Sequence, residues 1–187
     1  MSRPSPAPAA SGGPSLEADI AIEDDRWRAH GRIEAAAIAA ARAVGDADPA
    51  VFTGPCAATI QLTDDASIAA LNAQFRNKDA ATNVLSFPAG PTATEPGAPR
   101  YLGDIAIARE TVEREARDLN IPVTHHLQHL MIHGLLHLAG HDHLAGAEAE
   151  IMEAIETRLL AGLGVPDPYA PHDAAGIKRN RAEQTVL

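Results

Sequence analysis

The sequence predicts an α+β fold in which one small four-stranded mixed sheet is covered by about five helices in a single domain. Four short segments with strand patterns occur before residue 110, and three consecutive helical patterns follow them. The length of 187 residues suits one domain. Hydrophobic residues make up 45% of the chain and are rich in alanine, whereas aromatic residues make up 3%. We therefore expect a modest, helix-rich core.

The first elements are a strand and a helix. Residues 16–22 alternate apolar with acidic side chains, and this period of two is typical of a strand. The alanine-rich stretch after Asp24 and Asp25 predicts a helix to about Val44, where Gly45 ends it. Its apolar face carries Ile33, Ala37, Ile38 and Ala41.

A second strand and a second helix follow. Residues 57–62 have a strand pattern, and Asp64 or Asp65 is placed to cap the helix that comes next. Apolar side chains on this helix recur at helical spacing, so one of its faces is expected to be buried. They are Ile68, Leu71 and Phe75.

Two further strands enclose a loop. Residues 84–87 form a short apolar run, the stretch 89–100 is rich in Pro, Gly and Thr, and residues 101–108 are again strand-like. The Gly103-Asp104 pair within the last strand predicts a bulge or bend.

Three helices complete the domain. They are predicted over residues 109–120, 123–139 and 146–163. Pro122 suits the first position of the middle helix, and Gly140 is placed to end it.

The domain is expected to span residues 16–165, between a disordered tail over 1–15 and a C-terminal tail over 166–187. A single cysteine, Cys56, excludes an intramolecular disulfide and a four-cysteine zinc cluster. No apolar run approaches the roughly 18 residues of a membrane span, and the N-terminus lacks a signal-peptide pattern. We therefore expect a cytoplasmic protein with no membrane partner and no disulfide partner. The formal charge of −10, taken as a sum, disfavours nucleic acid as a partner.

Seven of the nine histidines lie between residues 125 and 143. His133 and His137 are four residues apart on a predicted helix, so both imidazoles project from one face and can share a metal ion. Gly140 lets the chain turn back, and His143 follows close enough to supply a third nitrogen. Three neutral imidazoles with one open position are typical of a catalytic zinc site, here one Zn²⁺ at the end of a core helix. Asp142 is placed to accept a hydrogen bond from a ligand.

The spacing also permits other arrangements of this segment. His129, His133 and His137 form a stripe, but three ligands on one straight helix span about 12 Å, too far for one ion. We expect the remaining histidines to face solvent or to support the ligands. The spacing also matches zinc peptidases of the metzincin type, but those carry a glutamate directly after the first histidine, where this chain has Gly134. A zinc peptidase is therefore a minor alternative.

Three segments together resemble the YbeY family of bacterial endoribonucleases and rRNA maturation factors. Residues 133–143 (HGLLHLAGHDH) resemble the family signature H-G-x-L-H-L-x-G-x-D-H, with His141 where relatives commonly carry an aromatic residue. Residues 71–88 resemble its arginine-bearing helix end and T-N-V-L-S-F-P strand, and residues 102–105 match its L-G-D-I strand. The resemblance covers roughly residues 16–164.

This resemblance implies a zinc-dependent, single-strand-specific endoribonuclease that acts in 16S rRNA 3′-end maturation and ribosome quality control. The implied partners are ribosomal RNA, the small ribosomal subunit and its proteins. The implied zinc ligands are His133, His137 and His143, and the implied functional arginine is Arg76.

Arg76 is a natural clamp for a phosphate because its guanidinium stays protonated and binds two oxygens at once. Lys78 can assist in that contact. The alternative from the residues alone is a helix-terminal arginine that caps the last carbonyls. A second alternative for the whole protein is a non-catalytic ribosome-assembly factor with a structural zinc, which would have four protein ligands.

Overall fold

The computed structural model describes residues 15–47, 54–90, 97–141, 146–170 and 185–186. It confirms the predicted α+β class, with a mixed sheet in the strand order β1-β2-β4-β3-β5. Strands β1, β2 and β4 run parallel to one another, whereas β3 is antiparallel to β4. The strands are β1 (Ser15–Ile22), β2 (Pro55–Thr63), β3 (Val84–Pro88), β4 (Arg100–Ala108) and β5 (Thr185–Val186).

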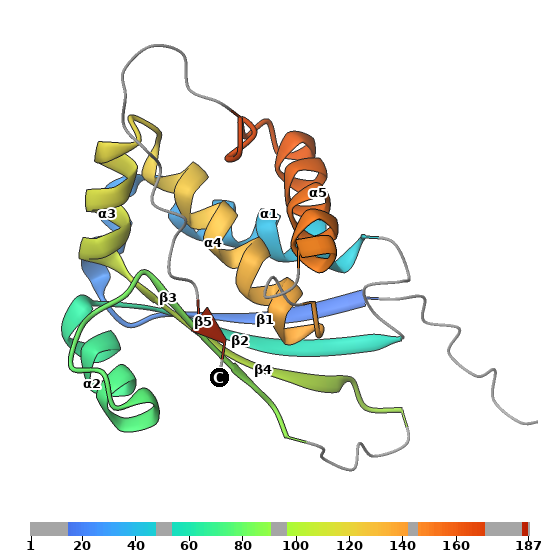
Figure 1. Ribbon diagram of the computed structural model, residues 1–187, viewed down its shortest axis with the longest axis horizontal. Helices are drawn as coiled ribbons and strands as arrows, with labels where there is room; N and C mark the ends of the chain where they lie inside the picture. Colours follow the sequence, from blue (N-terminus) through green and yellow to red (C-terminus); the bar gives the residue numbers. More distant parts are fainter. Residues whose placement is uncertain (1–14, 48–53, 91–96, 142–145, 171–184, 187) are drawn as a thin grey trace, which may run out of the picture.

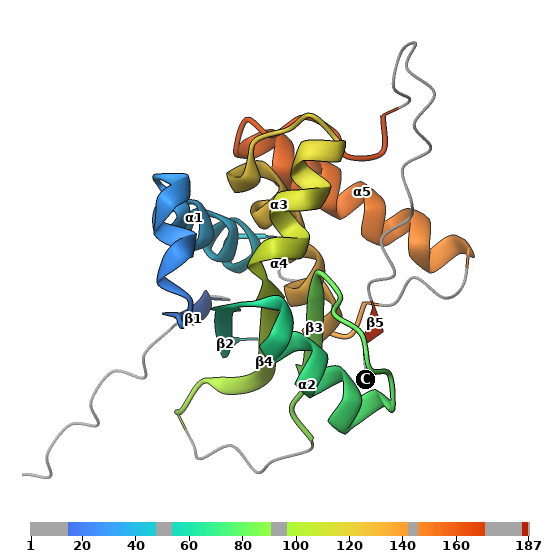
Figure 2. The same ribbon diagram turned by 90° about the vertical axis from the view of Figure 1, so that its left-hand side faces the viewer.

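The helices form a thick layer on one face of the sheet (Figures 1 and 2). Helices α1, α3, α4 and α5 lie on this face, and α2 lies on the other. Helix α4 is central in the layer because it contacts α1, α3 and α5 as well as β3 and β4. The bounds are α1 (Ile33–Gly45), α2 (Asp65–Arg76), α3 (Arg109–Asp118), α4 (Val123–Leu138) and α5 (Gly146–Gly162), with a 3₁₀ helix η1 (Asp25–His30) before α1.

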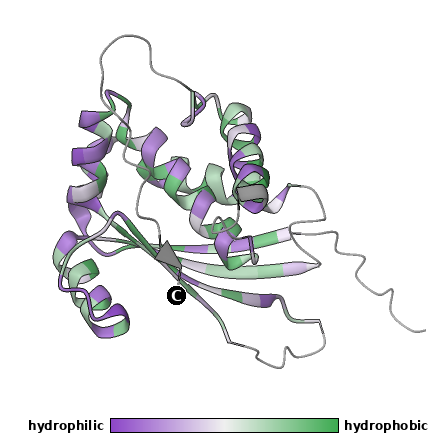
Figure 3. Ribbon diagram, viewed as in Figure 1, coloured by the Kyte–Doolittle hydropathy of each residue, from purple (hydrophilic) through white to green (hydrophobic). Residues whose placement is uncertain are grey.

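The core is divided by the sheet into two hydrophobic clusters. The larger one fills the space between the sheet and the main helical layer, with Ile60, Ile105 and Leu130 among its fully buried members. The smaller one lies under α2 and is built from Ile68, Leu85, Ala106 and Ala108. In Figure 3, which is coloured by hydropathy, the strands are mainly hydrophobic, as expected of a sheet with a core on both faces, whereas α3 is largely hydrophilic. Each of β3 and β4 therefore serves both clusters with alternate side chains.

The N-terminal region differs from the predicted single helix. Trp27 is fully buried and donates its indole N–H to the Thr63 carbonyl oxygen at 2.9 Å, which fixes η1 on the end of β2. Gly31 then adopts a φ of +74°, and α1 begins at Ile33. Ile38 was expected on the apolar face but is 38% exposed, because small alanines occupy the positions of α1 that face the core.

The bulge predicted at Gly103-Asp104 lies one residue earlier, because Leu102 is the extra residue of β4 between Tyr101 and Gly103. The register between β2 and β4 shifts between Ala57 and Ala58, and Gly103 has a φ of +136°. A Cβ atom at Gly103 would lie 2.1 Å from the Phe87 carbonyl oxygen, so a side chain does not fit there.

Two other boundaries differ slightly from expectation. Pro122 is the N-cap of α4 and not its first helical residue, which leaves the helix bounds almost unchanged. Thr185 and Val186, within the predicted C-terminal tail, pair in parallel with β3. Across the described ranges, every helix is too short or too polar to cross a membrane.

Candidate metal centre

Two buried histidines form the centre of the candidate site. His133 and His137 lie one turn apart on α4, and they are 6% and 5% exposed. Their ring centroids are 4.4 Å apart, and the two Nε2 atoms face each other at 2.9 Å. The i, i+4 spacing on a helix therefore brings two imidazole nitrogens close together, as the sequence predicted for a shared metal ion.

The opposite nitrogen of each ring is held by an oxygen acceptor. His133 Nδ1 lies 2.7 Å from Glu156 Oε1, and His137 Nδ1 lies 2.8 Å from the carbonyl oxygen of His141. A carboxylate and a carbonyl can only accept, so each Nδ1 carries the proton and donates it. In the neutral imidazole this leaves the lone pair on Nε2, the form that binds a metal ion.

The end of α4 provides the acceptor for His137. Gly140 has a φ of +100°, its N–H donates to the His137 carbonyl, and the His141 N–H donates to the Leu136 carbonyl. These bonds are the Schellman pattern of a helix C-terminus. The same turn carries the His141 carbonyl back to the His137 ring. The glycine that ends the helix thus also orients an imidazole.

The donor set fits a divalent cation such as Zn²⁺. Two neutral imidazoles that face each other through unprotonated nitrogens repel unless a proton or a cation lies between them. Two imidazole nitrogens on a tetrahedral zinc, each at about 2.0–2.1 Å, are roughly 3.3 Å apart. The observed separation of 2.9 Å requires only a small opening of the pair. The two anchored Nδ1 atoms match the usual support of histidine ligands.

The third predicted ligand, His143, and its neighbour Asp142 lie outside the described residues. Within the described ranges, no group of three or more His, Cys, Asp or Glu side chains could hold a metal ion. The described part of the chain therefore supplies two of the three predicted ligands, His133 and His137, and the acceptor that orients each of them.

Glu156 on α5 is the site residue that the sequence did not single out. Its side chain is completely buried, and its Oε2 atom accepts hydrogen bonds from His129 Nε2 at 3.1 Å and from the Tyr169 hydroxyl. Burial alone raises the pKa of this carboxyl, but the hydrogen bonds from His129 and His133 outweigh burial and hold the pKa well below its usual range. Glu156 is therefore a buried carboxylate with partners on both oxygens.

A signal for Glu156 was present in the sequence. It shares the buried face of α5 with Ala149, Met152 and Leu160, so a charged residue occupies a position with core periodicity. Such a residue is rarely buried without a partner.

Two further histidines on α4, His126 and His129, contact buried or half-buried carboxylates. His129 Nε2 is engaged by Glu156, and it lies 3.5 Å from the Tyr169 hydroxyl. His126 is buried and hydrogen-bonds to Glu115 at 2.7 Å. Asn83 Nδ2 donates to the same carboxylate at 3.0 Å. His126 thus belongs to a polar contact between α3 and α4.

The predicted RNA-contacting residues come from α2 and the loop after it. Arg76 is the last residue of α2 and is half-buried, and burial lowers the pKa of its guanidinium. Lys78 is exposed, and its backbone N–H donates to the Asn72 carbonyl at 3.3 Å. Phe75, which is half exposed, packs edge-to-face on Phe87 of β3, which fixes the end of α2 against the sheet.

Gly134 lies on the side of α4 that packs against β3 and β4. A Cβ atom there would lie 3.0 Å from Ile105 Cδ1 and 3.1 Å from Ser86 Oγ. A glutamate at this position would therefore enter the interface between α4 and the sheet.

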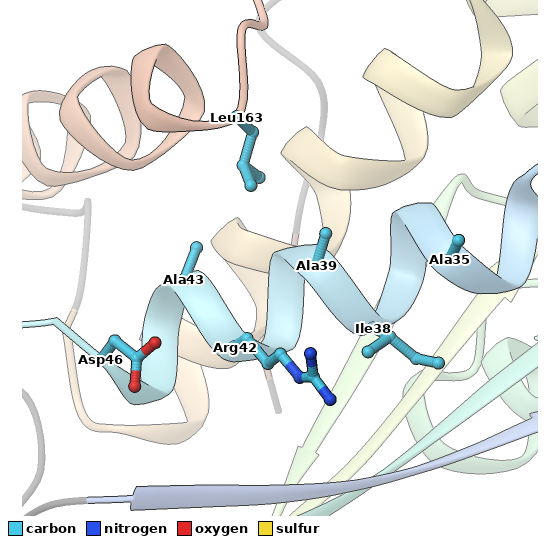
Figure 4. A pocket seen from close by; sticks show the side chains of 7 residues that line it. All are labelled: Ala35, Ile38, Ala39, Arg42, Ala43, Asp46 and Leu163. Carbon is cyan, nitrogen blue, oxygen red and sulfur yellow. The ribbon is translucent and has the colours of Figure 1, made fainter.

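A shallow groove elsewhere in the helical layer has no residue in common with the histidine cluster. Figure 4 shows Ile38 and Arg42 on the outer surface of α1, with Leu163 approaching from the end of α5. The small side chains of Ala35, Ala39 and Ala43 form its floor, and Asp46 is the one acidic side chain among its lining residues.

Comparison with known proteins assigns a family to this arrangement. The family model described as Endoribonuclease YbeY matches residues 26–164. Three relatives named Endoribonuclease YbeY are about half identical to this chain. Two are from Rhodopseudomonas palustris: both are 52% identical, one over 156 residues with 83% of this chain and 82% of the relative covered, the other over 162 residues with 84% and 92% covered. The third, from Nitrobacter winogradskyi, is 51% identical over 160 residues with 82% of each chain covered.

A solution structure of a Thermotoga maritima protein superposes on this chain with a TM-score of 0.46 at 24% identity. The superposition covers 82% of this chain and 99% of that one.

Proposed function

The chain belongs to the endoribonuclease YbeY family, and from this premise we propose that it is a zinc-dependent endoribonuclease specific for single-stranded RNA. The proposed substrate is ribosomal RNA, in 16S 3′-end maturation and ribosome quality control. The proposed partners are the small ribosomal subunit and its proteins in the cytoplasm. The names of the relatives support the nuclease activity, whereas the metal and the substrate are argued from the site.

One observation carries the proposal of a metal-dependent reaction. The Nε2 atoms of His133 and His137 face each other at 2.9 Å while both Nδ1 atoms donate to oxygen acceptors. We propose that these two atoms and His143, whose spacing in the sequence suits a third ligand, hold one Zn²⁺. Three histidine ligands leave a fourth position for water or substrate. Asp142 is proposed to support one of these ligands.

A bound Zn²⁺ supplies Lewis acidity toward a phosphoryl oxygen and a water whose pKa is near neutral. The chain's own contribution is to hold the imidazoles in the correct tautomer without rearrangement, because Glu156 and the His141 carbonyl already fix them. A preorganised site of this kind needs no reorientation of its ligands when substrate binds.

Arg76 is proposed to bind the phosphate at the cleaved bond, and Lys78 to assist. A guanidinium remains protonated at neutral pH even where burial lowers its pKa, and partial desolvation strengthens its attraction for an anion. This local positive charge explains how a chain with a net charge of −10 can act on RNA. We therefore expect weak, salt-sensitive binding to free RNA.

The surroundings of Gly134 argue against the zinc-peptidase alternative. Peptidases of that type use the glutamate at this position to activate water. In this chain, a side chain at 134 would meet Ile105 and Ser86 in the core, and glycine itself carries no proton acceptor. Peptide hydrolysis is therefore not expected.

The test compares cleavage of an RNA oligonucleotide that spans the 16S rRNA 3′ end, single-stranded and annealed to its complement, with zinc content measured in parallel. We expect one zinc per chain and cleavage of the single strand. His137→Ala should lose both zinc and cleavage, and Arg76→Ala should lose at least about 100-fold in cleavage while it retains zinc.

Two variants serve as matched controls. His125→Ala removes a histidine from the first turn of the same helix, and Arg42→Ala removes an arginine from the last turn of α1, as Arg76 is in the last turn of α2. Cleavage by His137→Ala at the wild-type rate would assign the activity to another site. Zinc bound by four protein ligands without any cleavage would instead favour the assembly-factor alternative.

A further inference from the structure

We propose that Glu156 and Tyr169 are a pair of positioning residues that fix His133 for metal binding, an inference that rests on the proposed metal function. Glu156 sets the tautomer of His133, and Tyr169 sets the orientation of Glu156. Neither residue is a proposed metal ligand, and Tyr169 lies beyond residues 26–164, which the family model matches.

The two oxygens of Glu156 have separate partners. Oε1 lies 2.7 Å from His133 Nδ1, whereas Oε2 accepts from His129 Nε2 at 3.1 Å and from the Tyr169 hydroxyl. A carboxylate has enough lone pairs for all three donors. Because the rotation of the carboxylate is fixed by the contacts at Oε2, Oε1 stays aligned with the His133 ring.

The burial of Glu156 makes this alignment strong. The side chain is 0% exposed, so water cannot replace a missing partner, and a charge buried in this way must be compensated by the groups around it. The groups that face it are His133 and His129 from α4 and Tyr169 from the segment after α5. Loss of any one donor would shift the carboxylate toward the remaining two.

Tyr169 is itself held in place by a short turn. Asp167 Oδ1 accepts from the Tyr169 backbone N–H at 2.8 Å and from the Thr157 hydroxyl at 3.2 Å. The Tyr169 ring packs edge-on against His129, with centroids 5.9 Å apart. The bond from Thr157, the residue next to Glu156, ties residues 167–169 to α5. The start of the predicted C-terminal tail is therefore part of the site.

The hydrogen bond from His129 to Glu156 bears on which histidines can bind a metal ion. Its Nε2 donates to Glu156 and so carries a proton, which leaves no lone pair there for a metal ion. His129 therefore supports the carboxylate instead of joining His133 and His137 as a ligand.

The first experiment measures zinc affinity by competition with a chromogenic chelator, on the full chain. In Glu156→Gln, the amide has one acceptor oxygen and one donor nitrogen. Because His133 and His129 contact different oxygens of Glu156, only one of them keeps an acceptor. We expect zinc binding about 10- to 100-fold weaker than in wild type. Tyr169→Phe removes only the hydroxyl, and we expect a loss of about threefold to tenfold.

The controls are matched in helix and in exposure. Glu150→Gln changes an exposed carboxylate on the same helix. Tyr101→Phe removes a hydroxyl that donates to Asp104 at 2.7 Å, from a tyrosine that is 40% exposed, as Tyr169 is. Both controls should bind zinc within about twofold of wild type.

The second experiment reads the tautomer of His133 in the metal-free protein by ¹⁵N NMR of labelled imidazoles. Wild type should carry the His133 proton on Nδ1. In Glu156→Gln, an amide N–H turned toward the ring would favour the Nε2–H tautomer, a change that a merely structural role would not produce.

The outcomes separate the two proposals. If wild type binds no zinc, the metal function fails, and the NMR measurement still decides the role of Glu156. A His133 proton on Nε2 in wild type, or unchanged zinc affinity in Glu156→Gln and Tyr169→Phe, would overturn the positioning pair. If Glu156→Gln does not fold, the zinc affinity of Tyr169→Phe is compared with that of Tyr101→Phe, and equal affinities would overturn the proposal.

Discussion

Arg109 and Glu156 are both buried ionisable side chains, but their surroundings differ in kind. Arg109 begins α3, and three carboxylates accept from its guanidinium at 2.7 Å, namely those of Asp24, Glu110 and Glu113. Burial lowers the pKa of Arg109, and these partners outweigh burial and raise it. Glu156 is instead surrounded by two imidazoles and a hydroxyl.

This difference separates a structural cluster from the candidate functional one. Every nitrogen of the Arg109 guanidinium has a carboxylate partner, so the cluster is complete and ties the loop before η1 to α3. The Glu156 cluster is complete around the carboxylate but ends in two imidazole nitrogens that face each other at 2.9 Å. The first cluster can stabilise the fold, and the second is suited to bind a cation.

The largest expected effect comes from breaking the structural cluster. Arg109→Met should destabilise the fold by about 3 kcal/mol or more, because it leaves Asp24 and Glu113 without their buried counter-charge. Urea unfolding measures this loss. The zinc affinity of the folded fraction should stay within about twofold of wild type, and a larger change would mean that the two clusters are coupled.

Removal of zinc should lower the stability that depends on the Glu156 cluster and leave the Arg109 cluster unchanged. With free zinc at 100 times its dissociation constant, wild type should gain about 2.7 kcal/mol of stability, and a chelator should remove that gain. His133→Ala and His137→Ala should show no difference between zinc and chelator in the same urea titration. A zinc-dependent gain that persists in both variants would place the metal elsewhere.

The smallest effect expected is a pH dependence of the Arg109 cluster. The side-chain hydrogen bond from Arg26, followed by the one from Arg109, outweighs burial and holds the pKa of Asp24 well below its usual range. Burial raises the pKa of Glu113, but Arg109 and His30 together lower it. Depressed carboxyl pKa values give stability that is present above about pH 4 and is lost as the pH falls toward the folded-state values.

Arg109→Met already removes the share of that contribution due to Arg109 at neutral pH, whereas the hydrogen bonds of Asp24 with Arg26 and of Glu113 with His30 remain. The stability gap between wild type and this variant should therefore narrow by on the order of 1 kcal/mol between pH 6 and pH 3. Unfolding curves at several pH values measure the gap. Glu156 and Glu115 also have lowered pKa values, but they are present in both proteins and cancel. A constant gap would show that Arg109 does not act through these carboxylates.

Local sequence was sufficient for the parts of the site that lie on one helix. The spacing of His133 and His137 and the stop at Gly140 are properties of consecutive residues, and the structure has a helix that ends at Leu138 with Gly140 at positive φ. Helix geometry alone then brings the two rings together.

The remaining parts depend on packing between distant segments. Glu156 is 23 residues from His133, and only the docking of α5 on α4 decides that this carboxylate meets the His133 ring. Tyr169 likewise reaches the site through a turn pinned by Asp167. The interruption before α1 follows from Trp27, whose indole binds the end of β2. Periodicity within a helix does not encode such tertiary contacts.

The two imidazoles at the centre of the site differ in what a point mutation can do to them. His137 is oriented by a main-chain carbonyl at residue 141, which every amino acid carries, so substitution of the acceptor residue leaves the acceptor in place. His133 is oriented by a side chain, which a single codon change can remove. We therefore expect single substitutions of the acceptor residue to change the orientation of His133 more than that of His137.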